Sequence, residues 1–227
     1  MEEILSLGLH EMGLPSGGGR LERFRRYYDY LTECNRVMNL TAIEGEEEAA
    51  RLHFLDCCAL LTVENFAGRR VIDVGSGAGF PGLPLKIAEP SVSLTLLDSL
   101  GKRVDFLRSA CRELALEDVE AVCARAEEAP AELRESFDIA VSRAVARLNV
   151  LCELCLPFVR AGGSFIAMKG PDCAEELAEA AEAVALLGGG VVAVVHEIPV
   201  VERFTRGGDV EKRIGAVVVH QVARPCV

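Results

Sequence analysis

The hydrophobic pattern changes character at about residue 66. Up to that point apolar residues recur every three or four positions, the period of an amphipathic helix, and no strand alternates with the helices. The spacing predicts one helix from Arg20 to a break at residues 39–43, and a second helix over residues 46–61. The buried stripe of the first helix is expected to consist of Leu21, Phe24, Tyr28 and Leu31. We therefore expect residues 1–66 to form a helical extension.

From residue 67 onwards short apolar runs alternate with helical segments. Strands are expected at residues 70–74, 92–98, 119–123, 137–142, 163–168, 191–197 and 214–222. Helices are expected over 102–116 and from an N-cap at Asp172 to about residue 187. The last two strands flank residues 205–209, which suggests the loop of a closing hairpin. This alternation predicts an α/β domain at 67–227, with a seven-stranded, mostly parallel sheet and helices on both faces.

The densest chemical signal follows the first of these strands. Residues 71–82 read Val-Ile-Asp-Val-Gly-Ser-Gly-Ala-Gly-Phe-Pro-Gly, so a buried strand delivers a carboxylate directly before a glycine-rich turn. Glycines let such a turn bend sharply and let a ligand lie against the backbone. A second acid ends the next strand, where it suits ribose hydroxyls. The residues assigned to this nucleotide site are Asp73, Gly75, Gly77, Gly79 and Asp98.

Two cofactors that carry an adenosine, NAD and S-adenosylmethionine, fit a strand followed by glycines and an acid. A dinucleotide site requires a third glycine for helix packing, and Phe80 stands in that place. Asp73, directly before the glycines, suits the cationic methionine end of S-adenosylmethionine and is awkward beside a pyrophosphate. The pattern therefore favours an S-adenosylmethionine-dependent methyltransferase over an NAD enzyme, and over a glycine turn without a ligand.

Further motifs appear in order along residues 39–170. They are Asn39-Leu-Thr-Ala-Ile43, Arg51-Leu-His53-Phe-Leu-Asp56, Gly79-Phe-Pro-Gly82, Lys102-Arg103, Arg125-Ala126-Glu127 and Ser142-Arg143-Ala-Val-Ala146. With these motifs the chain resembles the bacterial small-subunit rRNA guanine-N7 methyltransferase family, also called the glucose-inhibited division protein B family. Cys57 stands where that family usually has serine, which removes a good hydrogen-bond donor.

The resemblance implies a Rossmann-like class I methyltransferase fold that binds S-adenosylmethionine. It implies methylation of N7 of guanine 527 in the decoding-region loop of 16S rRNA, so the expected partner is 16S rRNA, the small ribosomal subunit or an assembly intermediate. Carried over by matching motif, the cofactor contacts fall on Gly75, Phe80, Asp98, Ser99, Leu100, Ala126, Glu127 and Arg143. Glu127 is expected where the adenine edge is read.

Arg143 is the predicted catalytic residue. Guanine N7 has an in-plane lone pair and needs no deprotonation, so in-line attack on a sulfonium methyl needs positioning rather than a general base. Arg143 follows the fourth strand at the carboxyl end of the sheet, where its guanidinium is able to reach O6 beside N7 or to hold a phosphate. The alternative is a structural salt bridge from Arg143 to Asp73 or Glu127.

Five further residues are candidates for contacts with the substrate. They are Asn39, His53, Lys169, Arg23 and Arg26. His53 and Asp56 share one helix face, which favours a structural pair over a polar tie to the substrate. Asn39 equally suits a helix-end cap, and Lys169 a solvated charge.

Composition at first argues against a nucleic-acid protein, because 24 basic and 35 acidic residues give a net charge of −11. The charge is uneven, since residues 20–26 carry four arginines against one glutamate and residues 203–213 carry four basic against two acidic residues. We expect these segments to form a narrow basic rim around the cleft, giving weak, salt-sensitive engagement of a folded ribosomal particle. Tyr27 and Tyr30 lie off the apolar stripe and are candidates for stacking on unpaired bases.

Cysteine usage indicates a reducing compartment. The nine cysteines are odd in number and irregularly spaced, the chain starts with acidic residues, and no apolar run reaches about 18 residues. We expect a cytoplasmic monomer with free thiols, no membrane span and no metal. The Cys152–Cys155 pair favours two core thiols on a helix over zinc or redox chemistry.

Other functions stay open at this point. Nothing in the composition excludes a methyltransferase of the same fold that acts on another RNA, a protein or a small molecule. A non-catalytic ribosome-assembly factor would also retain the fold, although the intact glycine loop with Asp73 and Asp98 argues against it.

Overall fold

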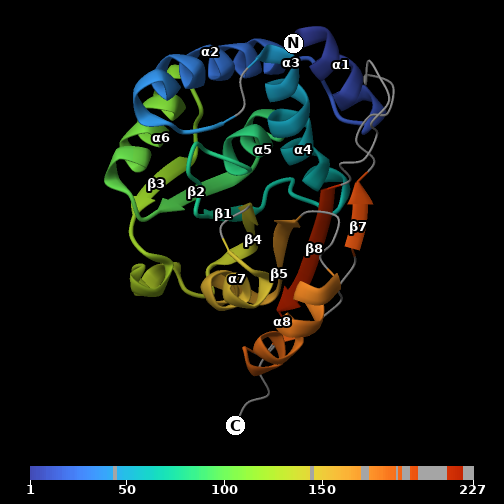
Figure 1. Cartoon of the computed structure of the whole chain (residues 1–227), viewed down its shortest axis with the longest axis vertical. Helices are drawn as coiled ribbons and strands as arrows, with labels where there is room; N and C mark the ends of the chain where they lie inside the picture. The colour runs from blue at the N-terminus through green and yellow to red at the C-terminus, as the bar shows by residue number, and fades with distance from the viewer. Residues whose placement is uncertain are drawn as a thin grey trace.

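The centre of the molecule is a parallel sheet (Figure 1). This computed structural model describes residues 1–42, 45–143, 146–169, 174–187, 189–190, 195–198 and 214–221. The parallel strands are β1 (Arg70–Val74), β2 (Ser93–Asp98), β3 (Val119–Cys123), β4 (Phe137–Arg143) and β5 (Val159–Lys169). Three antiparallel strands extend the sheet beyond β5: β6 (Gly189–Gly190), β7 (Val195–Ile198) and β8 (Ile214–Gln221). The order is β3-β2-β1-β4-β5-β8-β6, with β7 paired to β8.

The expected number of seven strands was wrong, because the described residues form five parallel and three antiparallel strands. The additional strand is Gly189–Gly190, where adjacent glycines give no strand signal because they have no side chains to pack. β7 and β8 pair in antiparallel fashion, as a closing hairpin requires. The expected loop at 205–209 and the expected N-cap Asp172 lie outside the described residues.

Helices cover both faces of the sheet, which confirms the α/β class. Successive strand residues point to opposite faces, so Val71 and Ile72 of β1 belong to two different hydrophobic cores. The core around Val71 includes α5 (Gly82–Ala88) and α6 (Gly101–Glu113). The core around Ile72 includes α7 (Leu148–Cys155) and α8 (Ala174–Leu186). Central strands buried on both sides explain the continuous apolar runs in the sequence.

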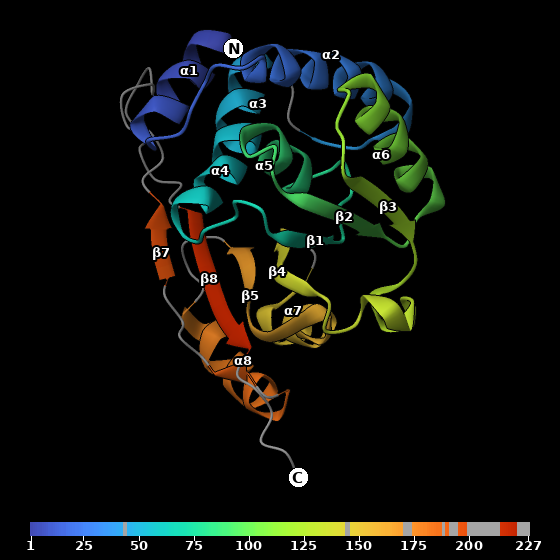
Figure 2. The same cartoon turned by 180° about the vertical axis from the view of Figure 1, so that it is seen from behind.

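The helices of residues 1–66 lie on the same side of the sheet as α5 and α6 (Figure 2). They begin with α1 (Glu2–Glu11) and α2 (Arg20–Met38). Where one helix was expected over 46–61, four turns of different pitch follow one another: α3 (Glu46–Ala49), a π-helical turn (Ala50–Leu55), α4 (Asp56–Cys58) and a 3-10 turn (Ala59–Thr62). π-Helical turns are frequent at functional sites, and this one carries His53. The domain boundary at residue 66 stays a prediction.

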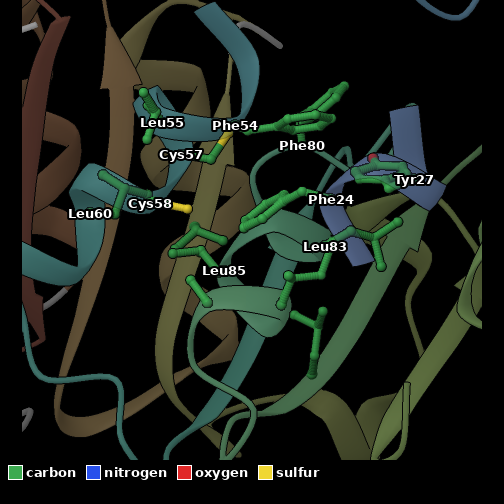
Figure 3. Close-up of a cluster of buried hydrophobic side chains, with 14 of the residues drawn as sticks. Phe24, Tyr27, Phe54, Leu55, Cys57, Cys58, Leu60, Phe80, Leu83 and Leu85 are labelled. Carbon is green, nitrogen blue, oxygen red and sulfur yellow. The ribbon is translucent and has the colours of Figure 1, made fainter. Parts of the chain in front are cut away.

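A buried aromatic cluster joins these helices to the loop after β1 (Figure 3). The ring centroid of Phe54 lies 5.2 Å from that of Phe24, 5.4 Å from that of Tyr27 and 6.2 Å from that of Phe80. The Tyr27 hydroxyl donates a hydrogen bond of 2.5 Å to the carbonyl oxygen of Ala78. The extension and the glycine loop therefore share one hydrophobic core.

Of the two tyrosines proposed for base stacking, Tyr27 is used inside the protein, whereas Tyr30 stays partly exposed. Tyr27 is fully buried and Tyr28 only partly, so the buried stripe of α2 is Phe24, Tyr27 and Leu31 rather than the expected one. The stripe is rotated because α2 packs against both α5 and α6, and not on a single partner. Tyr30 stacks on Phe106 of α6 with ring centroids 5.5 Å apart. In the part of the chain that the structure describes, no helix is long and apolar enough to cross a membrane.

Replacing Phe54 by Ala should lower the free energy of unfolding by about 3–5 kcal/mol, because the substitution leaves a cavity among three aromatic rings. Since the core is shared, denaturant unfolding followed by circular dichroism should keep a single transition. Leu186→Ala is the control, since this side chain is 80% exposed and its loss should change stability by no more than about 0.5 kcal/mol. A separate early transition of the extension would contradict the shared core.

Candidate functional site

An open cavity of 530 Å³ lies at the carboxyl ends of the parallel strands. The strand order reverses between β1 and β4, and ligands of doubly wound sheets bind at such a point. The loops after β1, β2 and β3 line the cavity together with Arg143 at the end of β4 and parts of the extension. Of the predicted cofactor residues, it brings together Gly75, Gly77, Phe80, Asp98, Ser99, Ala126, Glu127 and Arg143.

The glycine loop is held in a shape that needs glycine. Gly75, Gly77 and Gly79 all have positive φ, at 77°, 56° and 97°. The amide of Gly75 donates to the carbonyl oxygen of Leu97 at 2.8 Å, which ties the loop to the end of β2. Gly79 does not line the cavity, since a Cβ there would lie 2.5 Å from Leu83 and 2.8 Å from the Tyr27 hydroxyl. Gly79 therefore serves close packing under the loop.

Asp73 lies beneath this loop rather than in the cavity. Its side chain is fully buried, and one carboxylate oxygen accepts a hydrogen bond of 2.8 Å from the amide of Gly82 at the start of α5. The other oxygen, Oδ1, is buried without a hydrogen-bond partner in the structure. Burial raises the pKa of Asp73 to about 7. Asp73 therefore does not line the cavity, although the sequence predicted it beside the cationic end of the cofactor.

Asp98 organises the rim of the cavity. One of its carboxylate oxygens accepts a hydrogen bond of 2.9 Å from the amide of Gly77, and the other accepts one of 2.9 Å from the amide of Leu100. Arg103 approaches the same carboxylate at 3.6 Å. Each carboxylate oxygen has a second lone pair, so Asp98 still has acceptor capacity toward the cavity that it lines. Leu100, a predicted cofactor contact, does not line this cavity and is 52% exposed.

Arg143 reaches across the end of the sheet to the extension. Its guanidinium donates to the carbonyl oxygen of Leu52 at 3.1 Å and to Nδ1 of His53 at 2.9 Å, and it contacts the Cys57 sulfur at 3.5 Å. It also lies over the ring of Phe80, 5.5 Å from the centroid. Among the described residues no ion pair joins Arg143 to Asp73 or Glu127, the alternative considered from the sequence. Arg143 is held by the π-helical turn instead.

The same contacts fix the protonation state of His53. An arginine only donates, so Nδ1 of His53 must accept, and the proton of the neutral ring sits on Nε2. Nε2 lies 2.8 Å from the Thr41 hydroxyl and donates to it. Burial and the Arg143 charge lower the pKa of His53 to about 4, and the ring stacks on Phe80 with centroids 4.4 Å apart. His53 is therefore a neutral tie between Arg143 and the segment after α2.

Asp56 was predicted to share one helix face with His53. It is buried in α4, and burial raises the pKa of its carboxyl group to about 7, partly offset by the Arg143 charge. Cys57 stands where the family that the chain resembles usually has serine. Its sulfur contacts the Arg143 guanidinium. Burial raises the pKa of the Cys57 thiol to about 12, so the thiol is protonated at neutral pH.

Two predicted substrate residues, Asn39 and Lys169, do not line the cavity. Asn39 ends α2 in the left-handed conformation with φ of 51°, and it lines a second cavity that shares Thr41 and His53 with the first. Lys169 is 10% exposed, and its ammonium group lies 2.7 Å from both the Glu176 carboxylate and the carbonyl oxygen of Ala146. Lys169 is committed to α8 in this arrangement.

The basic segment at residues 20–26 lies at the opposite edge of the sheet. Arg20 donates to the carbonyl oxygen of Ala88 at the end of α5, and Arg26 pairs with Glu113 at the end of α6. Helices that follow parallel strands return toward the strands' amino ends, so both contacts lie away from the cavity. Arg23 and Arg26 therefore do not form the expected rim at the cleft. The other basic segment, 203–213, lies outside the described residues.

Sequence reasoning left several lining residues unassigned. Leu40, Thr41, Arg103 and Arg125 all line the cavity. Their motifs were visible in the sequence, but nothing there showed that the segment after α2 folds over the end of β1. Within the described ranges, no group of three or more His, Cys, Asp and Glu side chains is placed to hold a metal ion. Cys152 and Cys155 are buried thiols of α7, as expected.

The His53 ring should stay neutral from pH 8 down to about pH 5, because its pKa is lowered to about 4. Histidine-labelled NMR spectra test this, with the His53 signal assigned through a His53→Asn variant and the exposed His10 as reference. Arg143→Gln should raise the pKa of His53, while burial keeps it below 6.5. Because the folded pKa is lowered, the stability that His53 contributes is complete above pH 6.5 and is lost as pH falls toward 4. Titration near pH 6.5 in the unmodified protein would contradict this assignment.

Solved structures with a similar fold include several methyltransferases. A putative methyltransferase in complex with the Haloferax volcanii Trm112 methyltransferase activator matches with a TM-score of 0.58 and 16% identity, over 87% of this chain and 98% of that one. A SAM-dependent methyltransferase from Aquifex aeolicus matches with a TM-score of 0.54 and 18% identity, over 78% of this chain and 94% of that one. At these identities the matches establish the Rossmann-like class I fold.

Comparison of the sequence with known proteins identifies the family as well as the fold. The Ribosomal RNA small subunit methyltransferase G of Alkaliphilus metalliredigens is 46% identical over 214 residues, which cover 88% of this chain and 90% of the relative. The protein of the same name from Clostridium perfringens is 45% identical over 190 residues, or 82% and 80% of the two chains. The model of the GidB family, described as rRNA small subunit methyltransferase G, matches residues 20–202. The chain therefore belongs to the rRNA small subunit methyltransferase G family.

Proposed function

We propose that this protein transfers the methyl group of S-adenosylmethionine to N7 of guanine 527 in 16S rRNA. The observation that carries the proposal is the cavity in which Arg143, held by the extension, faces the glycine loop and the Asp98 rim. Membership of an rRNA methyltransferase family supports the substrate class. We further infer that the enzyme acts in the cytoplasm as a monomer.

The residues of the cavity fit S-adenosylmethionine. Gly75 and Gly77 present backbone without side chains, Asp98 has free acceptor capacity for the ribose hydroxyls, and Ala126 with Glu127 closes the far wall for the adenine. When bound, the cofactor supplies an electrophilic sulfonium methyl group. Phe80 packs against the cofactor side of the cavity and at the same time fixes the His53 ring.

Arg143 positions the guanine and takes no part in proton transfer. A guanidinium donates in a planar fork, so it suits the O6 atom beside N7, which lies on the edge that must face the methyl group. Of its donors, those toward Leu52 and His53 hold the side chain in place. Its fixed charge also orients the electron-rich edge of the base before the reaction begins.

No general base is needed, and the geometry of His53 agrees with this chemistry. N7 attacks through its own lone pair, so the transfer requires in-line placement and exclusion of competing poses. Both ring nitrogens of His53 are engaged, one by Arg143 and one by Thr41, which leaves neither free to accept a proton from the substrate. His53 is thus a positioning residue that acts through Arg143.

The proposal is tested in a strain from which the gene has been deleted, by nucleoside mass spectrometry and mapping of 16S rRNA. We expect 7-methylguanosine at position 527 to be absent and to return with the wild-type gene. Arg143→Lys keeps the charge and loses the planar fork, so single-turnover methylation of isolated subunits should fall by about 100-fold. The melting temperature and the S-adenosylmethionine affinity of this variant are measured alongside. Unchanged 7-methylguanosine in the deletion strain would overturn the assignment.

A further inference from the structure

A second, more apolar groove adjoins the proposed methyl-transfer cavity. It has a volume of 860 Å³ and runs between the second half of α2 and the beginning of α6. Its apolar lining includes Tyr30, Cys34, Val37, Met38, Leu100 and Phe106. Leu40 and Arg103 line both this groove and the cavity, so the two spaces share a wall. We call it the α2–α6 groove.

The banks of the α2–α6 groove carry exposed apolar side chains. Val37 is 86% exposed at the end of α2, and Leu100 is 52% exposed directly before α6. These are two of the few large hydrophobic residues that the described part of the chain leaves exposed. Two rings of its lining, Tyr30 and Phe106, stack with an interplanar angle of 12°. An apolar surface of this kind next to a functional cavity is typical of a binding surface.

The charges around the groove are suited to an anion. Lys102 and Arg103 stand on the α6 bank. The acid of the lining, Asp105, lies 3.6 Å from Arg108 and is thereby partly neutralised. Among the described residues, no ion pair involves Lys102. The groove thus offers an apolar slot with cations along its edge, on a protein whose net charge is −11.

We propose that the α2–α6 groove binds an unpaired nucleotide of the substrate RNA that neighbours the target guanine. The base lies in the apolar slot against Val37 and Leu100, and Lys102 contacts its phosphate. Unpaired bases are recognised in this way, through apolar contact with the base and cationic contact with the backbone. The shared wall at Leu40 and Arg103 gives a continuous path for the strand from the groove into the cavity. The inference rests on the proposed function.

The first test measures methylation of small ribosomal subunits isolated from the deletion strain. Val37→Asp should raise the KM for subunits about tenfold, because a carboxylate repels the phosphate and wets the slot. Its affinity for S-adenosylmethionine should stay unchanged, since Val37 does not line the cavity. The matched control is Leu186→Asp on α8, an equally exposed apolar residue (80%) far along the chain from the groove. Equal KM values for the two variants would overturn the proposal.

Salt dependence provides an independent readout. Lys102→Ala should reduce the slope of log affinity for the subunit against log salt by about 0.7, the value for one phosphate contact on a single strand. An unchanged slope would remove the phosphate contact from the proposal.

The second test identifies what occupies the groove. A benzophenone side chain introduced at position 37 should cross-link to 16S rRNA in the loop that contains the target guanine, and one introduced at position 186 should not. Cross-linking to a ribosomal protein, or no cross-link at all, would overturn the RNA assignment. Wild-type methylation of the same subunits is measured in parallel. Failure of the wild type would refute the proposed function, whereas activity with no effect at position 37 would refute only the groove.

Discussion

The contact between Arg143 and the π-helical turn is the interaction on which the site depends. Arg143 stands at the end of β4, and the groups that hold it, Leu52 and His53, come from a segment about 90 residues earlier in the chain. His53 accepts from Arg143 only as the neutral ring, and burial together with the Arg143 charge keeps it neutral. One buried imidazole therefore couples the extension, the sheet and the Phe80 ring into a single rigid arrangement.

The glycine loop is also held in place, by hydrogen bonds to the residues around it. Asp73 binds the start of α5, Asp98 binds Gly77, and Tyr27 binds the carbonyl of Ala78. Each of these groups replaces solvent for a backbone group that would otherwise be unsatisfied where the chain turns sharply. Preorganisation of this kind suits a transfer that needs placement and no proton movement.

The acidic composition is compatible with an RNA substrate because recognition depends on local surface. Arg20 and Arg26 bind the ends of α5 and α6, so these arginines stabilise the packing of α2 and do not surround the cleft. Cations at the start of α6 lie next to the cavity instead. A few well-placed contacts on a negatively charged protein favour a folded particle of matching shape over RNA in general.

The five parallel strands and the residues at their carboxyl ends could be predicted from the sequence. Those signals are local: apolar runs mark buried strands, and Gly75, Gly77 and Asp98 must meet at one edge once the strands are parallel. No local pattern could show which face of α2 is buried, what holds Arg143 and where residues 20–26 lie. Helix rotation and the partners of a long side chain depend on the sum of many contacts between segments far apart in the chain. Because of those contacts Tyr27 is buried, Asp73 lies under the loop, and His53 lies within hydrogen-bond distance of Arg143.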